Sequence, residues 1–229
     1  MTPESFNIAD MKEKTGFNVT PDAVDRLSRY RAVLLRMKAF GFVKVFSDNL
    51  GDALGVSSSQ VRKDFALFGM KGMKRGGYQI AELLERLSSL LGVADSLPII
   101  VIGCGNIGTA ILHTYGGKRE GVRVVAGFDI NPKVVAPHAE LPIYDVSDLI
   151  PYIEKNHIRV AVLAVPDEAA SGVMERLRRS AVQGVLNFTR APLRGDAQCL
   201  VQSIDIRMEI EKLFCFVHLQ PRSSGKAKS

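Results

Sequence analysis

Apolar residues in the N-terminal part of the chain recur at the three- and four-residue spacing that is typical of amphipathic helices. Pro21 opens such a pattern, which runs to Gly41 and has inward positions at Val24, Leu27, Tyr30, Val33, Leu34 and Met37. Residues 43–46 are short and extended. A further helical pattern covers residues 80–92, with Leu83, Leu84, Leu87, Leu90 and Leu91 apolar. These elements predict a small, mostly helical unit.

Two shorter helices are predicted within this unit, separated by a turn at Gly55. Ser47 can cap the first, over residues 48–54, in which the inward positions are Leu50, Ala53 and Leu54. Ser57 or Ser58 can cap the second, which runs to Phe68 and has inward positions at Val61, Phe65 and Phe68. The pair has the order of a helix-turn-helix.

The outer face of the second short helix carries side chains that suit DNA, namely Ser58, Ser59, Gln60, Arg62 and Lys63. Residues near the start of a recognition helix reach base edges in the major groove. Glutamine can pair with adenine there, and arginine or lysine with guanine. Glycines and cations alternate over residues 69–78, which favours a β-ribbon wing with Lys74 and Arg75 at its tip. The alternative is an ordinary helical cap with a solvated basic face.

The charge distribution favours the DNA-binding interpretation. The chain of 229 residues carries a net charge of +6, whereas residues 26–75 alone hold eleven basic and three acidic residues. A basic segment of this kind predicts a polyanionic partner. Apolar runs stay below the ~20 residues of a membrane span. The three scattered cysteines match neither a zinc site nor a disulfide framework, so we expect a reduced, cytoplasmic protein without a metal.

A different alternation begins near residue 97. An apolar run over residues 97–102 leads into a glycine-rich turn, a helix-compatible stretch follows, and a second apolar run ends at Asp129. The turn consists of Gly103, Cys104, Gly105, Asn106, Ile107 and Gly108. This is the order of a dinucleotide site, in which the three glycines allow the tight turn, the approach of the pyrophosphate and close helix–strand packing.

Asp129 follows Gly108 by 21 residues, which is the place of the carboxylate that binds the adenosine ribose. A carboxylate there would repel a 2′-phosphate. The sequence therefore predicts NADH and NAD⁺, rather than their phosphorylated forms, as the cofactor.

The remaining chain continues as alternating strands and helices. We predict strands over residues 141–144, 159–165 and 184–188 and helices over residues 148–156 and 167–180. This pattern is typical of a parallel α/β sheet with helices on both faces. Ligands bind at strand ends in such sheets, so Val165, Pro166 and Asn187 are candidates for the nicotinamide half. Buried strand ends without ligand contact are the alternative.

The last helical pattern, over residues 205–219, is apolar on more than one side. The sheet can cover only one side, so we expect the rest to meet a second subunit. The predicted organisation is an extension (1–20), a winged-helix domain (21–92), a Rossmann domain (93–204), a dimer-exchange helix (205–219) and a disordered tail (220–229). None of the four histidines lies in a pattern with an acidic residue and an arginine, as a dehydrogenase active site would require. This indicates that the chain binds the cofactor without catalysing hydride transfer.

Several motifs follow one another across both predicted domains. They are Gln60-Val61-Arg62-Lys63-Asp64-Phe65 with Phe68-Gly69, the glycine turn, Gly127-Phe128-Asp129, Leu163-Ala164-Val165-Pro166 with Ala169-Ala170, and Gly184-Val185-Leu186-Asn187-Phe188. Together they resemble the Rex family of bacterial redox-sensing transcriptional repressors, over residues 21–217. The resemblance implies a homodimer with an exchanged final helix that binds palindromic operator DNA and is released by NADH.

Carried over by position, Arg62 and Lys63 read the operator, Pro166 lies near the nicotinamide, and Asp205 helps to switch between the DNA-bound and NADH-bound states. Three departures affect this switch and the wing. Met73 precedes the basic pair, the family tyrosine falls at Thr114 with Tyr115 next to it, and the arginine partner of the aspartate falls at Ala32 with Arg31 next to it. An NAD-dependent oxidoreductase with an accessory helical domain, or a module for a CoA-type cofactor, are the alternatives.

Overall fold

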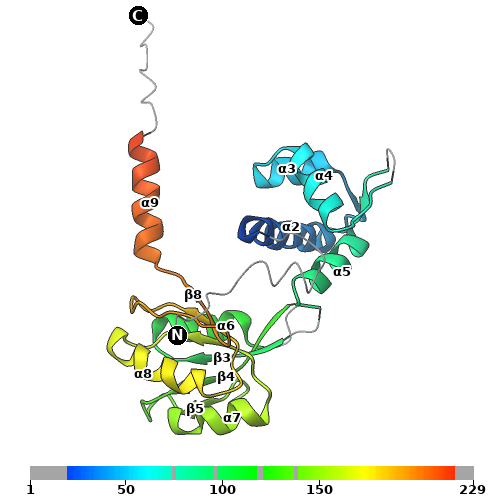
Figure 1. Ribbon diagram of the computed structural model, residues 1–229. Helices are drawn as coiled ribbons and strands as arrows, with labels where there is room; N and C mark the ends of the chain where they lie inside the picture. The colour runs from blue at the N-terminus through cyan, green and yellow to red at the C-terminus, as the bar shows by residue number, and fades with distance from the viewer. Residues whose placement is uncertain (1–19, 74–75, 95–96, 118–120, 137–138, 220–229) are drawn as a thin grey trace, which may run out of the picture. The chain divides into compact units, whose positions relative to one another are not determined.

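The computed structural model describes residues 20–73, 76–94, 97–117, 121–136 and 139–219 (Figure 1). The predicted wing tip (Lys74 and Arg75), nearly all of the predicted extension and the predicted tail lie outside these residues. The chain forms two compact units, with a boundary between Leu97 and Pro98, and residues 121–123 group with the first unit. Each unit has its own hydrophobic core.

The first unit contains the predicted helices. Its elements are α2 (Pro21–Ala39), β1 (Lys44–Val45), α3 (Ser47–Leu54), α4 (Ser58–Leu67), β2 (Tyr78–Gln79) and α5 (Ile80–Leu90). The Thr20 hydroxyl caps α2, and Ser57 caps α4 by accepting a hydrogen bond from the Gln60 backbone N–H at 3.2 Å. Gly55 ends α3 in the left-handed conformation. The helix-turn-helix prediction is confirmed.

The helices of the first unit pack around aromatic rings. Tyr30 and Phe65 are fully buried and meet edge to face, with ring centroids 5.3 Å apart, and Phe65 also packs edge to face on Tyr78. β1 and β2 pair antiparallel, and a bridge between Met73 and Gly77 extends the ribbon. The predicted β-ribbon therefore follows the recognition helix.

Two local expectations for α3 are wrong. Ser47 does not cap this helix but is its first residue, because the backbone N–H of Phe46 donates to the Asn49 side chain at 3.2 Å and Phe46 takes the cap position. Ala53 is exposed rather than inward, whereas Leu50 is fully buried.

The second unit is a doubly wound α/β domain. Its elements are β3 (Leu97–Ile102), α6 (Asn106–Tyr115), β4 (Val122–Asp129), β5 (Ile143–Asp145), a 3-10 turn (Val146–Asp148), α7 (Leu149–Lys155), β6 (Val160–Leu163), α8 (Asp167–Arg178), β7 (Gly184–Asn187), β8 (Leu200–Ser203) and α9 (Ile206–Leu219). The sheet order is β5-β4-β3-β6-β7-β8. β3 pairs in parallel with β6, β4 with β5, β6 with β7, and β7 with β8. This is the strand order of a Rossmann fold.

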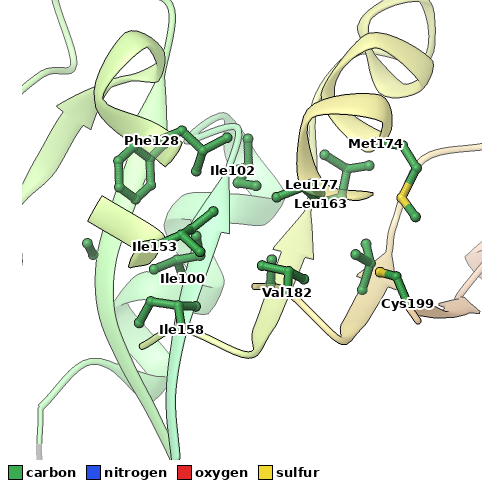
Figure 2. Close-up of a cluster of buried hydrophobic side chains, with 14 of the residues drawn as sticks. Ile100, Ile102, Phe128, Ile153, Ile158, Leu163, Met174, Leu177, Val182 and Cys199 are labelled. Carbon is green, nitrogen blue, oxygen red and sulfur yellow. The ribbon is translucent and has the colours of Figure 1, made fainter. Parts of the chain in front are cut away.

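Alternate residues of the central strands enter two cores, one on each face of the sheet. Ile100 and Ile102 of β3 pack in one cluster with Ile153 of α7 and Met174 of α8, as Figure 2 shows. Val101 packs in the other cluster with Leu112 of α6. The period of two along β3 therefore confirms that helices cover both faces.

Candidate cofactor cleft and nucleic-acid interface

The carboxyl ends of β3 and β6 lie at the point where the strand order reverses, which is where doubly wound sheets bind ligands. A cleft of about 570 Å³ opens there, lined by residues 103–107, 129–131 and 164–166 together with Val134. Its volume is in the usual range for a small-molecule site. The cleft contains every predicted cofactor residue except Gly108 and Asn187.

The three motif glycines have different roles in this turn. Gly103 has φ +91°, and a β-carbon there would lie 2.5 Å from the carbonyl oxygen of Ala164. A β-carbon at Gly108 would overlap the carbonyl oxygen of Gly103. At Gly105, in contrast, a β-carbon would meet nothing within 4 Å. The fold requires Gly103 and Gly108, whereas at Gly105 it leaves open space beside the cleft.

Gly105 is also the N-cap of α6, and no side chain caps this helix. The first N–H groups of a helix lack intrahelical partners. They attract anions, which the helix dipole favours at this end. The N-terminus of α6 therefore faces the cleft as a site suited to a phosphate.

The Asp129 carboxylate lies beside this turn and is held by two backbone N–H groups. Cys104 N–H donates to Oδ2 at 2.6 Å, and Asn131 N–H donates to Oδ1 at 2.8 Å. Each carboxylate oxygen can accept a further bond. The arrangement presents a fixed acceptor to a ribose diol.

Cys104 lies in the same turn, is largely buried and lines the cleft. Burial and the nearby Asp129 charge raise the pKa of its thiol to about 11. The thiol is therefore protonated at neutral pH, which is the less reactive form of a cysteine.

A second cavity of about 360 Å³ adjoins the first and shares five lining residues with it, Gly103, Asp129, Ile130, Val165 and Pro166. Its other walls are largely apolar, with Phe128 at the end of β4 and Val173 on α8. A flat apolar ring next to a ribose at Asp129 would fit between these walls. Val165 and Pro166, which the sequence predicts as cofactor contacts, line both cavities.

Asn187 ends β7, as expected, but its side chain is bonded within the sheet. It is fully buried at the end of β7, its side-chain oxygen accepts from the N–H and hydroxyl of Thr189, and its amide nitrogen donates to Ala191 O and Ser203 Oγ. These bonds connect β7 to β8, and Asn187 is not among the lining residues of either cavity. These bonds give Asn187 a structural role, and its contact with the cofactor stays a prediction.

On α4, the exposed face carries Ser59, Arg62 and Lys63 as the sequence predicts. Arg62 donates to the hydroxyl of Ser47 at 2.9 Å, which ties the recognition helix to the start of α3. Ser58 and Gln60 are half-buried. The side-chain amide of Gln60 does not extend freely into solvent, because it donates to Asp64 at 2.8 Å.

Asp64 is the centre of a buried polar network that sequence reasoning missed. Its side chain is 4% exposed and accepts from Arg26 at 2.7 and 2.8 Å, from Tyr30 at 2.9 Å and from Gln60. Burial opposes its charge, but these donors, led by Arg26, hold the pKa of Asp64 below its ordinary value. Burial and the Asp64 hydrogen bond raise the pKa of Tyr30. The network fixes α4 against α2.

Comparisons with known proteins agree with this geometry. A family described as "Putative DNA-binding protein N-terminus" matches residues 18–66, and one described as "CoA binding domain" matches residues 95–191. The redox-sensing transcriptional repressor Rex of Listeria welshimeri is 34% identical over 197 residues, which are 86% of this chain and 92% of that protein. That of Thermosipho africanus is 36% identical over 191 residues, 83% of this chain and 91% of its own length. The chain belongs to the Rex family.

Solved structures of a Rex-family repressor, RSP, have the same fold. RSP in complex with β-NAD⁺ and operator DNA superposes with a TM-score of 0.73 at 26% identity, covering 87% of this chain and 97% of that one. RSP in complex with β-NADH gives a TM-score of 0.74 at 26% identity, covering 87% and 94%. The resemblance predicted from the motifs is confirmed.

The residues predicted for the Rex switch belong to α2, α6 and the start of α9. Arg31 donates to Ser88 of α5 at 2.9 Å within the first unit. Asp205 accepts from the backbone N–H groups of Arg207 and Met208 and so caps α9. Tyr115 is the last residue of α6 and is 45% exposed. The roles of these three residues in the switch stay predictions.

Within the part of the chain that the structure describes, no helix is long and apolar enough to cross a membrane. The same residues contain no cluster of His, Cys, Asp and Glu that could hold a metal ion.

Proposed function

We propose that this protein is a transcriptional repressor that binds operator DNA when NADH is scarce and is released from it by NADH. The observation that carries the proposal is the pairing of two sites on one Rex-family chain. α4 presents a capped, basic recognition helix, and the β3–β6 crevice presents a glycine turn with Asp129 beside it. Relatives along most of the chain are named as redox-sensing repressors.

In the cofactor site, the pyrophosphate of NADH would lie on the N-terminus of α6 above Gly105. The adenosine ribose would donate to Asp129, and the adenine ring would enter the apolar cavity beside Phe128. The contact of Pro166 with the nicotinamide remains part of the proposal. Asp129 also argues against a CoA-type cofactor, because the phosphate on the adenosine ribose of CoA would approach its carboxylate.

In the DNA interface, α4 would enter the major groove with Arg62 and Lys63 toward base edges. The serines at its start would bind phosphate, and the wing with Lys74 and Arg75 would lie along the backbone. Since Ser47 holds the Arg62 guanidinium at 2.9 Å, the arginine is partly ordered before it meets DNA. This would lower the entropy that binding must overcome.

The dimer would form through α9. Every residue of this helix is exposed in the single chain, among them Leu213, Phe214, Phe216 and Leu219 at 60–71%. An apolar surface of this extent favours a protein partner. A second copy of the chain would bury this surface if the two subunits exchange α9, as the family resemblance implies. The two-fold symmetry of such a dimer would match a palindromic operator.

We infer a sensing rather than a catalytic role for the bound cofactor, since the chain resembles repressors along its length. Asp205 at the start of α9 would belong to the element that changes between the two states. The protein would act in the cytoplasm, where bacterial operator DNA lies.

The test is a titration of the full-length protein against DNA. A site is selected from a pool of randomised duplexes, and its affinity is measured with no cofactor, with NAD⁺, with NADH and with CoA. The protein should bind the selected DNA more weakly with NADH than under the other three conditions. Equal affinity under all conditions would refute the redox-sensing role, and failure to select any site would refute DNA binding.

A further inference from the structure

The side chain of Gln60 has one defined orientation in the structure. Its amide nitrogen Nε2 donates to Oδ1 of Asp64 at 2.8 Å, one turn further along α4. A carboxylate can only accept hydrogen bonds. The reversed amide would place its oxygen against the carboxylate, so the contact itself determines which side of the amide faces Asp64.

Asp64 is a suitable anchor because three other hydrogen bonds, from two residues of α2, hold its carboxylate. Arg26 binds both of its oxygens and Tyr30 binds one, while the side chain is 4% exposed. The lowered pKa of Asp64 keeps it ionised, and hence acceptor-only, at neutral pH. Movement of the carboxylate would break all of these bonds together.

Gln60 lies in the first turn of α4, where residues of a recognition helix approach base edges. A glutamine three residues after a capping serine commonly reaches back to the cap backbone. Here the Ser57 hydroxyl accepts from the Gln60 backbone N–H, but the Gln60 side chain turns forward to Asp64 instead. The amide is therefore not used to cap the helix.

After the bond to Asp64, the Gln60 amide retains one N–H donor and its carbonyl acceptor. Adenine presents the complementary pair in the major groove, an N7 acceptor and an N6 donor. We propose that Asp64 is a positioning residue that holds the Gln60 amide for adenine, so that Gln60 determines an A·T preference in each half-site. This inference rests on the proposed DNA-binding function.

Gln60 differs from the basic residues beside it on α4 in how its side chain is held. No hydrogen bond or ion pair of the Lys63 side chain occurs among the described residues, so Lys63 reaches DNA as a free cation. Gln60 instead meets DNA with its amide already oriented. Asp64 therefore affects the preference for A·T at one position of each half-site, and not the overall affinity for DNA.

The experiment measures affinities of the full-length protein for a selected duplex and for every single-base-pair variant of it. The proteins are wild type, Gln60→Ala, Asp64→Asn, the double variant, and Lys63→Ala as a control on the same helix. In the wild type we expect a preference for A·T, on the order of 5- to 150-fold, at one symmetry-related pair of positions. Gln60→Ala should abolish it, Asp64→Asn should weaken it, and the double variant should match Gln60→Ala. Lys63→Ala should leave this preference in place.

Unchanged base preferences in Gln60→Ala would overturn the inference. So would a uniform loss of affinity for all duplexes in Asp64→Asn, because a purely structural carboxylate would act on all sequences alike. If Asp64→Asn does not fold, Arg26→Lys takes its place, because an ammonium cannot bind both Asp64 oxygens as the guanidinium does. The A·T preference should then weaken, and an unchanged preference would overturn the role of Asp64. Failure to select any duplex would refute the proposed function instead.

Discussion

Replacing Gly105 with serine tests whether NADH binding, and not the stability of the fold, requires glycine at this position. A β-carbon at this position meets no atom within 4 Å, and the backbone of Gly105 is extended (φ −71°, ψ −160°), as an N-cap residue normally is. Serine is a preferred N-cap residue, so we expect the melting temperature to stay close to that of the wild type. The added side chain occupies the space of the pyrophosphate. Losing one charge-assisted hydrogen bond costs about 1.5–3 kcal/mol. This corresponds to a Kd for NADH that is roughly 10- to 150-fold higher, which a calorimetric titration would measure.

Gly108→Ala is the matched comparison, because its β-carbon would overlap the Gly103 carbonyl oxygen. We expect this variant to lose about 1–3 kcal/mol of stability through overpacking. Wild-type NADH affinity in Gly105→Ser would refute the placement of the pyrophosphate. A large loss of stability in the same variant would show that the fold, and not the ligand, requires this glycine.

Three further predictions concern the ribose, the operator and the dimer. Asp129→Asn should weaken NADH binding and narrow the difference from NADPH, and calorimetry showing equal NADH and NADPH affinity in the wild type would contradict the ribose contact. Arg62→Ala should cost about 1–3 kcal/mol of operator binding with NADH affinity unchanged, and normal operator affinity in both Arg62→Ala and Lys63→Ala would exclude them from recognition. Phe214→Asp should weaken the free energy of dimerisation by about 3–5 kcal/mol, the cost of losing a buried phenyl ring, and so shift the protein from dimer to monomer in sedimentation experiments. Glu211→Gln on the same helix should remain dimeric. A dimeric Phe214→Asp would argue against an α9 interface.

The elements with strong periodicity could be predicted from the sequence. The repeat of α2, the cap and inner face of α4, and the order of strand, glycine turn, helix and Asp129 all follow from local chemistry. β8 was not predicted, because its four residues are mostly exposed, lack alternation and end in Gln202 and Ser203. Only its pairing with β7 makes it a strand.

The partners of polar side chains could not be predicted in the same way. Gln60 lies on the expected helix, but Asp64, held by Arg26 from 38 residues away, determines its orientation. Asn187 ends the expected strand, but bonds to Thr189, Ala191 and Ser203 occupy its amide. Spacing along a chain indicates which face a residue occupies, whereas its hydrogen-bond partners depend on packing between distant segments.

The most direct test of the account is the reciprocity between its two ligands. NADH can release DNA only by binding one state of the dimer more tightly, so operator DNA must weaken NADH binding by the same factor. Calorimetric titration of NADH into the free and the operator-bound protein, compared with operator affinity with and without NADH, should give two equal factors of about 5- to 150-fold. NADH affinity that is identical in free and operator-bound protein would contradict the account.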